Sequence, residues 1–290
     1  MSEIPVITAL LIAITCAVSY QGFKHPAFER RHLFDPQAIL AGKEYSRIIT
    51  SAFLHANWQH LIFNMMSLYF FGRTLELFLG VPQFLLIYFG AIAGGSLLSL
   101  YVHRHHVYTA YGASGGVCGI IFAYILLVPG SGIQMFYLPI SIPGWLYAIV
   151  YILYSFFGMK EHRGDVGHDA HLGGAIIGFL IAAGLNWQAV LNNPVVFGIV
   201  LVAAILLLVY LWINPLFLPL SAVFARSTSK PRKNLPPHKR ESLQLDAILD
   251  KIAASGISSL SPEEKQFLGE ASHKFQRRAD SKKPESGLAI

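Results

Sequence analysis

Apolar runs as long as a membrane-crossing helix recur along this chain, and they constrain its fold more than any other feature. A helix rises 1.5 Å per residue, so about twenty apolar residues cross the ~30 Å hydrocarbon layer of a bilayer. The chain is 54% hydrophobic and only 13% charged. We therefore expect an all-α fold, a polytopic membrane helix bundle. Its seven candidate spans are residues 4–20, 60–79, 84–102, 112–128, 134–157, 168–187 and 195–213.

The spans and the charges together predict four regions. Residues 1–187 hold six spans and form the core, and residues 188–225 contain an additional transmembrane helix and its exit. Residues 226–242 read as a basic linker, and residues 243–290 as a short amphipathic helical tail. Thirteen of the 22 Lys and Arg residues follow residue 225. The spans therefore offer no nucleic-acid site, and the tail is expected to dock on a partner or on the membrane surface.

The sequence has no motif typical of a cleaved signal peptide, a disulfide framework or a metal site. Glu3 is the only charge before the first span, so we expect no cleaved signal peptide. Cys16 and Cys118 both fall inside apolar runs, which argues against disulfides or a thiolate metal cluster. The histidine-rich turn at residues 103–106 has no thiolate or carboxylate close in sequence. We therefore expect neither a metal site nor a cofactor.

A serine between glycines opens the fourth apolar run, where residues 111–119 read YGASGGVCG. The first amides of a helix lack intrahelical partners and carry the positive end of the helix dipole, so they would stabilise negative charge developing at Ser114. Gly112 and Gly115 leave room for another backbone to approach the hydroxyl. The alternative is that these glycines only form a small-residue stripe along which two membrane helices pack.

The second span carries a polar stripe. His60 and Asn64 are four residues apart and share one helix face. An imidazole and a carboxamide held near a nucleophile supply the donors of an oxyanion hole. The alternative is that they only hydrogen-bond this helix to a neighbour. Further along, Arg73 and Glu76 are expected to pair with each other or with a neighbouring loop.

The sixth span begins with a histidine followed by a second glycine stripe. His171 precedes Gly174 and Gly178, whose spacing lets another helix lie very close. If this stripe faces the one that contains Ser114, the imidazole meets the hydroxyl and can act as its general base. Asp169 lies two residues before His171 and points to another helix face. The sequence therefore predicts a Ser-His dyad.

Together these residues resemble the rhomboid family of intramembrane serine proteases. The resemblance covers about residues 1–187 and rests on four polar positions on three predicted helices. It implies that Ser114 is the nucleophile and His171 the general base. It also implies an oxyanion hole formed by His60, Asn64 and the backbone amide of Ser114.

Three further positions can be compared with the family. His55 matches a second, structural histidine of the first loop. Tyr45-Ser46-Arg47 stands where the family often has Trp-Arg, so the tryptophan is missing. Cys118 stands where many members carry an aromatic ring that stacks on the catalytic histidine. Since a cysteine cannot stack in this way, the histidine ring must be held differently.

The resemblance implies an intramembrane serine endopeptidase that cleaves single-span transmembrane proteins within the lipid bilayer. A noncatalytic rhomboid-like membrane chaperone and a histidine-lined metal or solute transporter are the alternatives. An α/β-hydrolase is remote, because its G-x-S-x-G turn follows a strand. We expect an integral, multi-pass protein of the bacterial cell (inner) membrane.

The membrane orientation involves a conflict. With seven spans, 21 of the 22 basic residues share one face, which the positive-inside rule makes cytoplasmic. The resemblance instead implies an active site that opens outward. The conflict disappears if residues 195–213 do not cross the membrane.

Overall fold

The computed structural model describes residues 5–104, 108–128, 130, 132–134, 141–161, 167–213, 248 and 260–269. Two compact units divide the chain after Phe217. In the first unit every predicted apolar run contains a long helical segment, so the predicted helical membrane bundle is confirmed. Its long helical segments are α1 (Val6–Lys24), α5 (Trp58–Ser67) with the π-helical turn η2 (Leu68–Gly72) and α6 (Arg73–Leu79), α7 (Val81–His103), α8 (Ser114–Leu127), α9 (Gly144–Glu161), α10 (His168–Leu185) and α12 (Pro194–Ile213).

Length and composition identify membrane-crossing helices within the described residues. α1, α7 and α10 are long and apolar enough to span a bilayer. Shorter apolar stretches lie in α8, in α9 (Gly144–Met159) and in α12 (Pro194–Leu207). The chain is therefore a multi-pass membrane protein.

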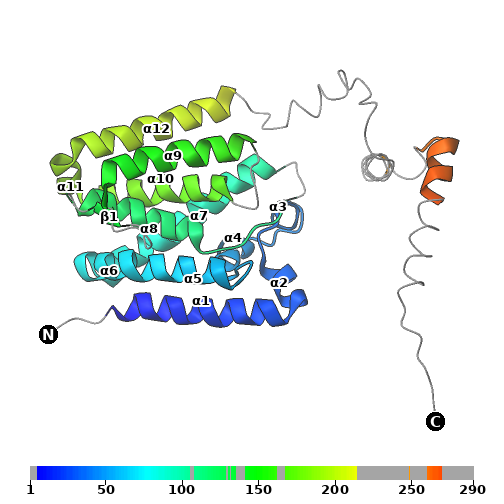
Figure 1. The fold of residues 1–290 in the computed structure, drawn as a ribbon, viewed down its shortest axis with the longest axis horizontal. Coiled ribbons are helices and arrows are strands. Elements are labelled where there is room, and N and C mark those ends of the chain that lie inside the picture. The colour runs from blue at the N-terminus through cyan, green and yellow to red at the C-terminus, as the bar shows by residue number, and fades with distance from the viewer. Residues whose placement is uncertain are drawn as a thin grey trace, which may run out of the picture. The chain divides into compact units, whose positions relative to one another are not determined.

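Helix α8 lies in the middle of the bundle. It packs against α7 and α10, and also contacts α5, η2 and α9. Figure 1 shows the long helices running side by side, with α1 at one margin and α12 at the other. Most of the α8 side chains are buried, which is typical of a helix that is apolar on all sides.

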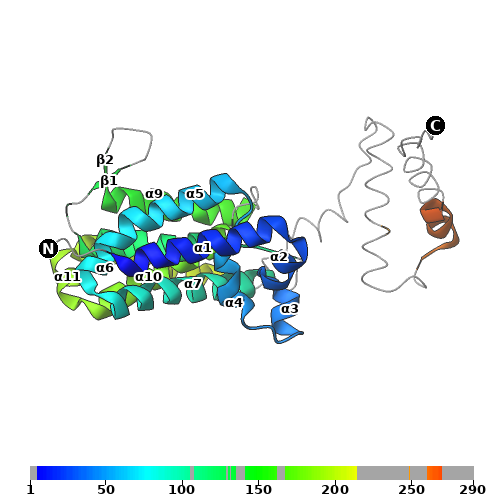
Figure 2. The ribbon, with the colours of Figure 1, turned by 90° about the horizontal axis from the view of Figure 1, so that it is seen from below.

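Short helices connect the long ones. The first loop, residues 25–57, contains α2 (Pro26–His32), α3 (Pro36–Leu40), α4 (Arg47–Thr50) and the 3-10 turn η1 (Ser51–Phe53). Figure 2 shows α2, α3 and α4 grouped at one end of α1. At the other end of the bundle, α11 (Trp187–Asn192) joins α10 to α12.

The predicted fifth span, residues 134–157, begins too early. Strands β1 (Gly132–Gln134) and β2 (Ser141–Pro143) form an antiparallel pair in which Ile133 lies opposite Ile142. Helix α9 begins only at Gly144, directly after this pair. The run read as one span contains Pro139 and Pro143, and proline is disfavoured in a helix interior, so the sequence did hold a signal for the later start.

The predicted partners of Glu76 were wrong. The buried Glu76 carboxylate accepts hydrogen bonds from the backbone N–H groups of Ile7 (2.9 Å) and Thr8 (2.7 Å) and from the Thr8 hydroxyl (2.7 Å). The first amides of α1 have no intrahelical acceptors, and a membrane supplies none. Arg73 instead lies 5.6 Å from the ring centre of Tyr69. Glu76 thus caps α1 rather than pairing with Arg73.

The second unit contains one described helix, residues 262–269. Its start has reciprocal bonds: Glu264 N–H donates to Ser261 Oγ (3.2 Å), and Ser261 N–H donates to Glu264 Oε2 (2.7 Å). This is the capping-box arrangement. The predicted basic linker, residues 226–242, lies outside the described residues.

Candidate active site

Ser114 and His171 lie in direct contact. The distance between Ser114 Oγ and His171 Nε2 is 2.7 Å, although 57 residues separate them. With the imidazole proton on Nδ1, Nε2 accepts the hydroxyl proton. Both residues begin or nearly begin a helix, α8 and α10. The structure thus places a potential base within hydrogen-bond reach of a potential nucleophile.

Glycines bring the two helices together. A Cβ added at Gly174 would lie 2.7 Å from the carbonyl carbon of Gly115, and one added at Gly178 would lie 2.8 Å from that of Gly119. Real Cβ atoms do not approach backbone so closely, so α8 and α10 reach this separation only because these positions lack side chains. The facing stripes set the depth at which Ser114 meets His171.

The start of α8 offers backbone donors to a developing anion. The N–H of Val117 donates to the Ala113 carbonyl (2.9 Å), as in a helix. The N–H groups from Ser114 to Gly116 come before this hydrogen bond in the chain. They also lie at the positive end of the helix dipole. Helix α8 has 14 residues, which rise about 21 Å, less than the ~30 Å hydrocarbon layer. If its far end reaches the opposite membrane surface, Ser114 lies below the near one.

His60 lies against Gly112, beside the serine. A Cβ built on Gly112 would be 2.7 Å from His60 Cε1, 3.1 Å from His60 Nε2 and 3.6 Å from Ser114 Oγ. The imidazole of His60 and the hydroxyl of Ser114 therefore border the same small space. Gly112 has φ = 135°, a backbone conformation that favours glycine. Any side chain at this position would be strained and would strike His60.

Asn64 lies one helical turn from His60 and is buried. Its carboxamide nitrogen Nδ2 donates to the His60 carbonyl oxygen at 2.9 Å. A carboxamide nitrogen has two N–H groups, so this bond leaves one more for another acceptor. The structure brings Ser114, His171 and His60 together, whereas the observed bond of Asn64 is within its own helix.

His55 ties the first loop to the residue before the serine. The N–H of Ala113 donates to His55 Nε2 (3.4 Å), while His55 Nδ1 is 3.0 Å from Ser19 Oγ. Ser19 Oγ is itself 2.8 Å from the Phe53 carbonyl oxygen, which can only accept. A neutral His55 with its proton on Nδ1 satisfies all three bonds. Burial, and secondarily the neighbouring His60, lower the pKa of His55 from its ordinary 6.5 to about 3.

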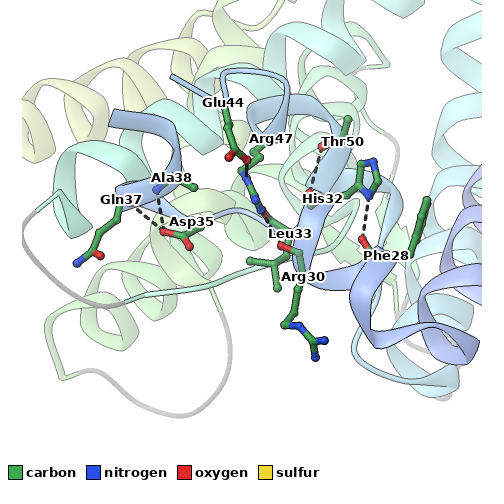
Figure 3. A network of polar contacts seen from close by, with 10 residues as sticks. All are labelled: Phe28, Arg30, His32, Leu33, Asp35, Gln37, Ala38, Glu44, Arg47 and Thr50. Carbon is green, nitrogen blue, oxygen red and sulfur yellow. Dashed lines mark hydrogen bonds and ion pairs between the residues drawn. The ribbon is translucent and has the colours of Figure 1, made fainter. Parts of the chain in front are cut away.

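The first loop also holds the strand-like segment that leads to Ser114. Phe34 and Ala110 exchange two backbone hydrogen bonds of 2.9 and 3.1 Å, and Gly112 N–H donates to the Ser51 carbonyl (3.0 Å). The loop is in turn organised by Arg47, which is 8% exposed and lies at the centre of the network in Figure 3. Its partners are the carbonyls of Arg30 and Leu33 (2.9 and 2.8 Å) and the carboxylate of Glu44 (2.6 Å).

Cys118, at the position where many family members carry an aromatic ring, makes a different contact here. Cys118 Sγ lies 2.7 Å from the hydroxyl of Tyr151 on α9. The ring of His168, one turn before His171, is edge-on to the His171 ring with centroids 6.4 Å apart. His168 is 3% exposed, and a Cβ added at Gly158 would lie within 2.6 Å of its ring atoms. The sequence offered no signal for this neighbour.

Asp169 and His103 lie in contact, a pairing that sequence reasoning missed and that is an ion pair when the imidazole is protonated. Asp169 Oδ2 lies 3.3 Å from His103 Nε2 on α7, consistent with the prediction that Asp169 does not face His171. Within the described residues, no cluster of three or more His, Cys, Asp or Glu residues could hold a metal ion. His105 and His106 of the histidine-rich turn lie outside those residues.

The fold and the site define a class: a polytopic membrane protein with a serine-histidine pair inside its helix bundle. A family described as the rhomboid domain matches residues 42–188, half of the chain. The protein therefore belongs to the rhomboid family. A family of unknown function, DUF6576, matches residues 238–274.

Curated relatives support the same family. The chain is 32% identical over 137 residues to "Rhomboid protein 1, mitochondrial" of Saccharomyces cerevisiae, covering 46% of this chain and 40% of that protein. It is 34% identical to "RHOMBOID-like protein 12, mitochondrial" of Arabidopsis thaliana, covering 45% and 43%. It is 33% identical to "Rhomboid protease GluP" of Bacillus subtilis, covering 59% and 31%. The chain thus spans about two fifths of the length of the first curated relatives it matches.

Proposed function

We propose that this protein is an intramembrane serine endopeptidase that cleaves transmembrane helices with a Ser114-His171 dyad. The observation that carries the proposal is the 2.7 Å contact between Ser114 Oγ and His171 Nε2. Membership of a family with relatives named as proteases supports it. Substrates would be single-span membrane proteins. We propose that the protein resides in the bacterial inner membrane.

The proposed reaction has two halves. His171 Nε2 takes the Ser114 proton while Oγ bonds to the peptide carbonyl carbon, and the carbonyl oxygen becomes an oxyanion. The Ser114 amide and the side chains of His60 and Asn64 would stabilise that charge. The C–N bond then breaks, and the leaving nitrogen receives the proton from His171. Water next attacks the acyl-enzyme with His171 as base, which releases the new carboxyl group and restores Ser114.

A helical substrate must unwind locally, because the carbonyls of an intact helix are hydrogen-bonded and shielded. Helix-destabilising residues lower the cost of unwinding relative to alanine, by about 1 kcal/mol for glycine and about 3 kcal/mol for proline. We therefore expect cleavage near the membrane surface at such residues.

The test is cleavage of a model single-span substrate by purified protein in lipid. Ser114→Ala should abolish cleavage while the unfolding temperature stays near wild type, because the change removes only the hydroxyl. The matched control is Ser46→Ala, an exposed serine that makes no cap hydrogen bond, and it should cleave normally. Cleavage by Ser114→Ala would refute the assignment. A folded wild-type protein that binds but never cleaves substrates would instead favour a noncatalytic chaperone.

A further inference from the structure

Three buried or half-buried side chains near the dyad come from three different segments. His103 ends α7, Tyr108 lies in the segment that leads to Ser114, and Asp169 lies in the first turn of α10. The proposed mechanism uses none of them. Their contacts nevertheless join the two segments that present the nucleophile and the base.

The first contact is between an imidazole and a carboxylate, which form an ion pair when the imidazole is protonated. His103 Nε2 lies 3.3 Å from Asp169 Oδ2, and the two side chains are 15% and 5% exposed. A buried carboxylate is costly unless it is paired, so losing either partner is expected to be disruptive. The pair therefore fixes the first turn of α10, two residues before His171, to the end of α7.

The second contact is a ring stack on the same imidazole. The rings of His103 and Tyr108 are parallel within 5°, with centroids 3.6 Å apart. The Tyr108 ring also meets Phe34 of the first loop edge-on, at 6.3 Å. Burial, and secondarily the Asp169 charge, raise the pKa of Tyr108, so its phenol stays protonated at neutral pH.

We propose that His103, Tyr108 and Asp169 form a positioning clasp that holds the segment entering Ser114 in register with the helix start bearing His171. The clasp rests on the proposed function, since it concerns the geometry of that dyad. Glycine packing sets the separation of α8 and α10, but it does not hold the segment before Ser114. The clasp links that segment to α10 through the imidazole of His103.

A positioning role predicts lost reactivity without lost substrate binding. We expect Asp169→Asn, His103→Leu and Tyr108→Leu each to lower kcat about tenfold, with KM within about twofold of wild type, because small misplacements of reacting groups slow the chemical step. The rate at which a fluorophosphonate labels Ser114 should fall by a similar factor. His103→Arg should recover most of the rate, because a guanidinium both pairs with a carboxylate and stacks on a ring.

The experiment uses the full chain in lipid and corrects every rate for the folded fraction. Tyr108→Phe, which keeps the stack, should label within about threefold of wild type. Tyr101→Leu is the matched control, since this exposed tyrosine lies on α7 two residues before His103. The double variant Asp169→Asn/Tyr108→Leu should be little worse than either single variant, because residues that act as a unit are not additive.

The clasp and the proposed function fail in different ways. If wild type is labelled but the clasp variants keep wild-type labelling and kcat, the clasp is wrong and the dyad stands. The clasp is also wrong if the fold-loss in rate of the double variant equals the product of the fold-losses of the two single variants. A wild type that neither reacts at Ser114 nor cleaves substrate would refute the proposed function, and the clasp with it.

Discussion

At the scale of single residues, the partners of His55 determine its chemistry. An N–H donor on one side and a hydroxyl that is engaged with a carbonyl on the other require a neutral ring. A protonated ring carries hydrogen on both nitrogens, so Nε2 would have no lone pair to accept the Ala113 N–H. The low pKa of His55, about 3, and the directions of its hydrogen bonds therefore both indicate a neutral imidazole. His55 acts on Ser114 indirectly, through the backbone of Ala113.

This state predicts a pH dependence of stability. The folded pKa of His55 is lowered from 6.5 to about 3, so its stabilisation is complete above about pH 6.5 and is lost as the pH falls toward 3. The slope from this group approaches about 1.4 kcal/mol per pH unit. We expect His55→Asn to be less stable than wild type at pH 7 but to lose less stability between pH 6 and 4.

Unfolding in lipid or mild detergent at stepped pH measures both quantities. The matched control is His25→Asn, an exposed histidine at the start of the same loop. Equal slopes for wild type and His55→Asn would show that His55 does not bind its proton differently on unfolding.

The sequence showed which polar residues are important better than it showed which residues they contact. Ser114 and His171 could be paired in advance because each heads a glycine-striped apolar helix, and two such stripes pack together. The partners of Glu76 and Asp169 are a helix start and an imidazole from distant segments. Helical periodicity gives the face on which a side chain lies, but not which element packs against that face.

At the scale of helices, the contact between α8 and α10 controls the dyad. Gly174→Ala would place a methyl group against the Gly115 backbone, and Gly178→Ala would do so at Gly119. Backbone cannot move aside as a side chain can, so the helices must separate. We expect each variant to lose about 1–3 kcal/mol of stability and most of its cleavage activity.

The same helix provides the control. A Cβ added at Gly184 of α10 meets nothing within 4 Å, so Gly184→Ala should be neutral or stabilising by up to about 1 kcal/mol. Thermal unfolding and cleavage of the model substrate compare the three variants. Equal tolerance of alanine at positions 174, 178 and 184 would mean that close packing does not set the Ser114-His171 distance.

Element boundaries were predictable where a pattern was long. Apolar runs gave the spans, whereas the start of α9 was wrong because the run read as one span includes the end of β1 and all of β2. The π-helical turn η2 was not foreseen either, since its sequence, LYFFG, is apolar like its flanks. Such a turn adds a residue to the helical repeat and shifts the faces of α5 and α6 relative to each other.

At the scale of the whole molecule, α12 runs back toward the end of the bundle that holds the dyad. Phe197 near its start stacks on Phe179 in the second half of α10, and Tyr210 near its end meets Phe156 in the second half of α9. Because α9 ends where α10 begins, α12 ends on the side of Ser114. This arrangement favours crossing by α12, whose end then lies on the same side as the first loop.

The charges then predict which side that is. Arg73 lies toward the opposite end, whereas the other 21 basic residues belong, by their order in the sequence, to the connections on the Ser114 side or follow residue 225. Excess Lys and Arg mark the cytoplasmic side. We expect Ser46→Cys in the first loop and Ser227→Cys beyond α12 to resist an impermeant thiol reagent in intact cells and to react in inverted vesicles.

Gln83→Cys, at the exposed start of α7, is the matched site at the opposite end and should react in intact cells. Wild type, whose Cys16 and Cys118 lie within helices, supplies the background. If Ser46→Cys reacts in intact cells while Ser227→Cys does not, α12 fails to cross and the site opens outward. If both react in intact cells, α12 crosses but the charge bias does not orient this protein. Orientation decides from which side a substrate must present its cleavable residues, because the dyad lies near only one end of the bundle.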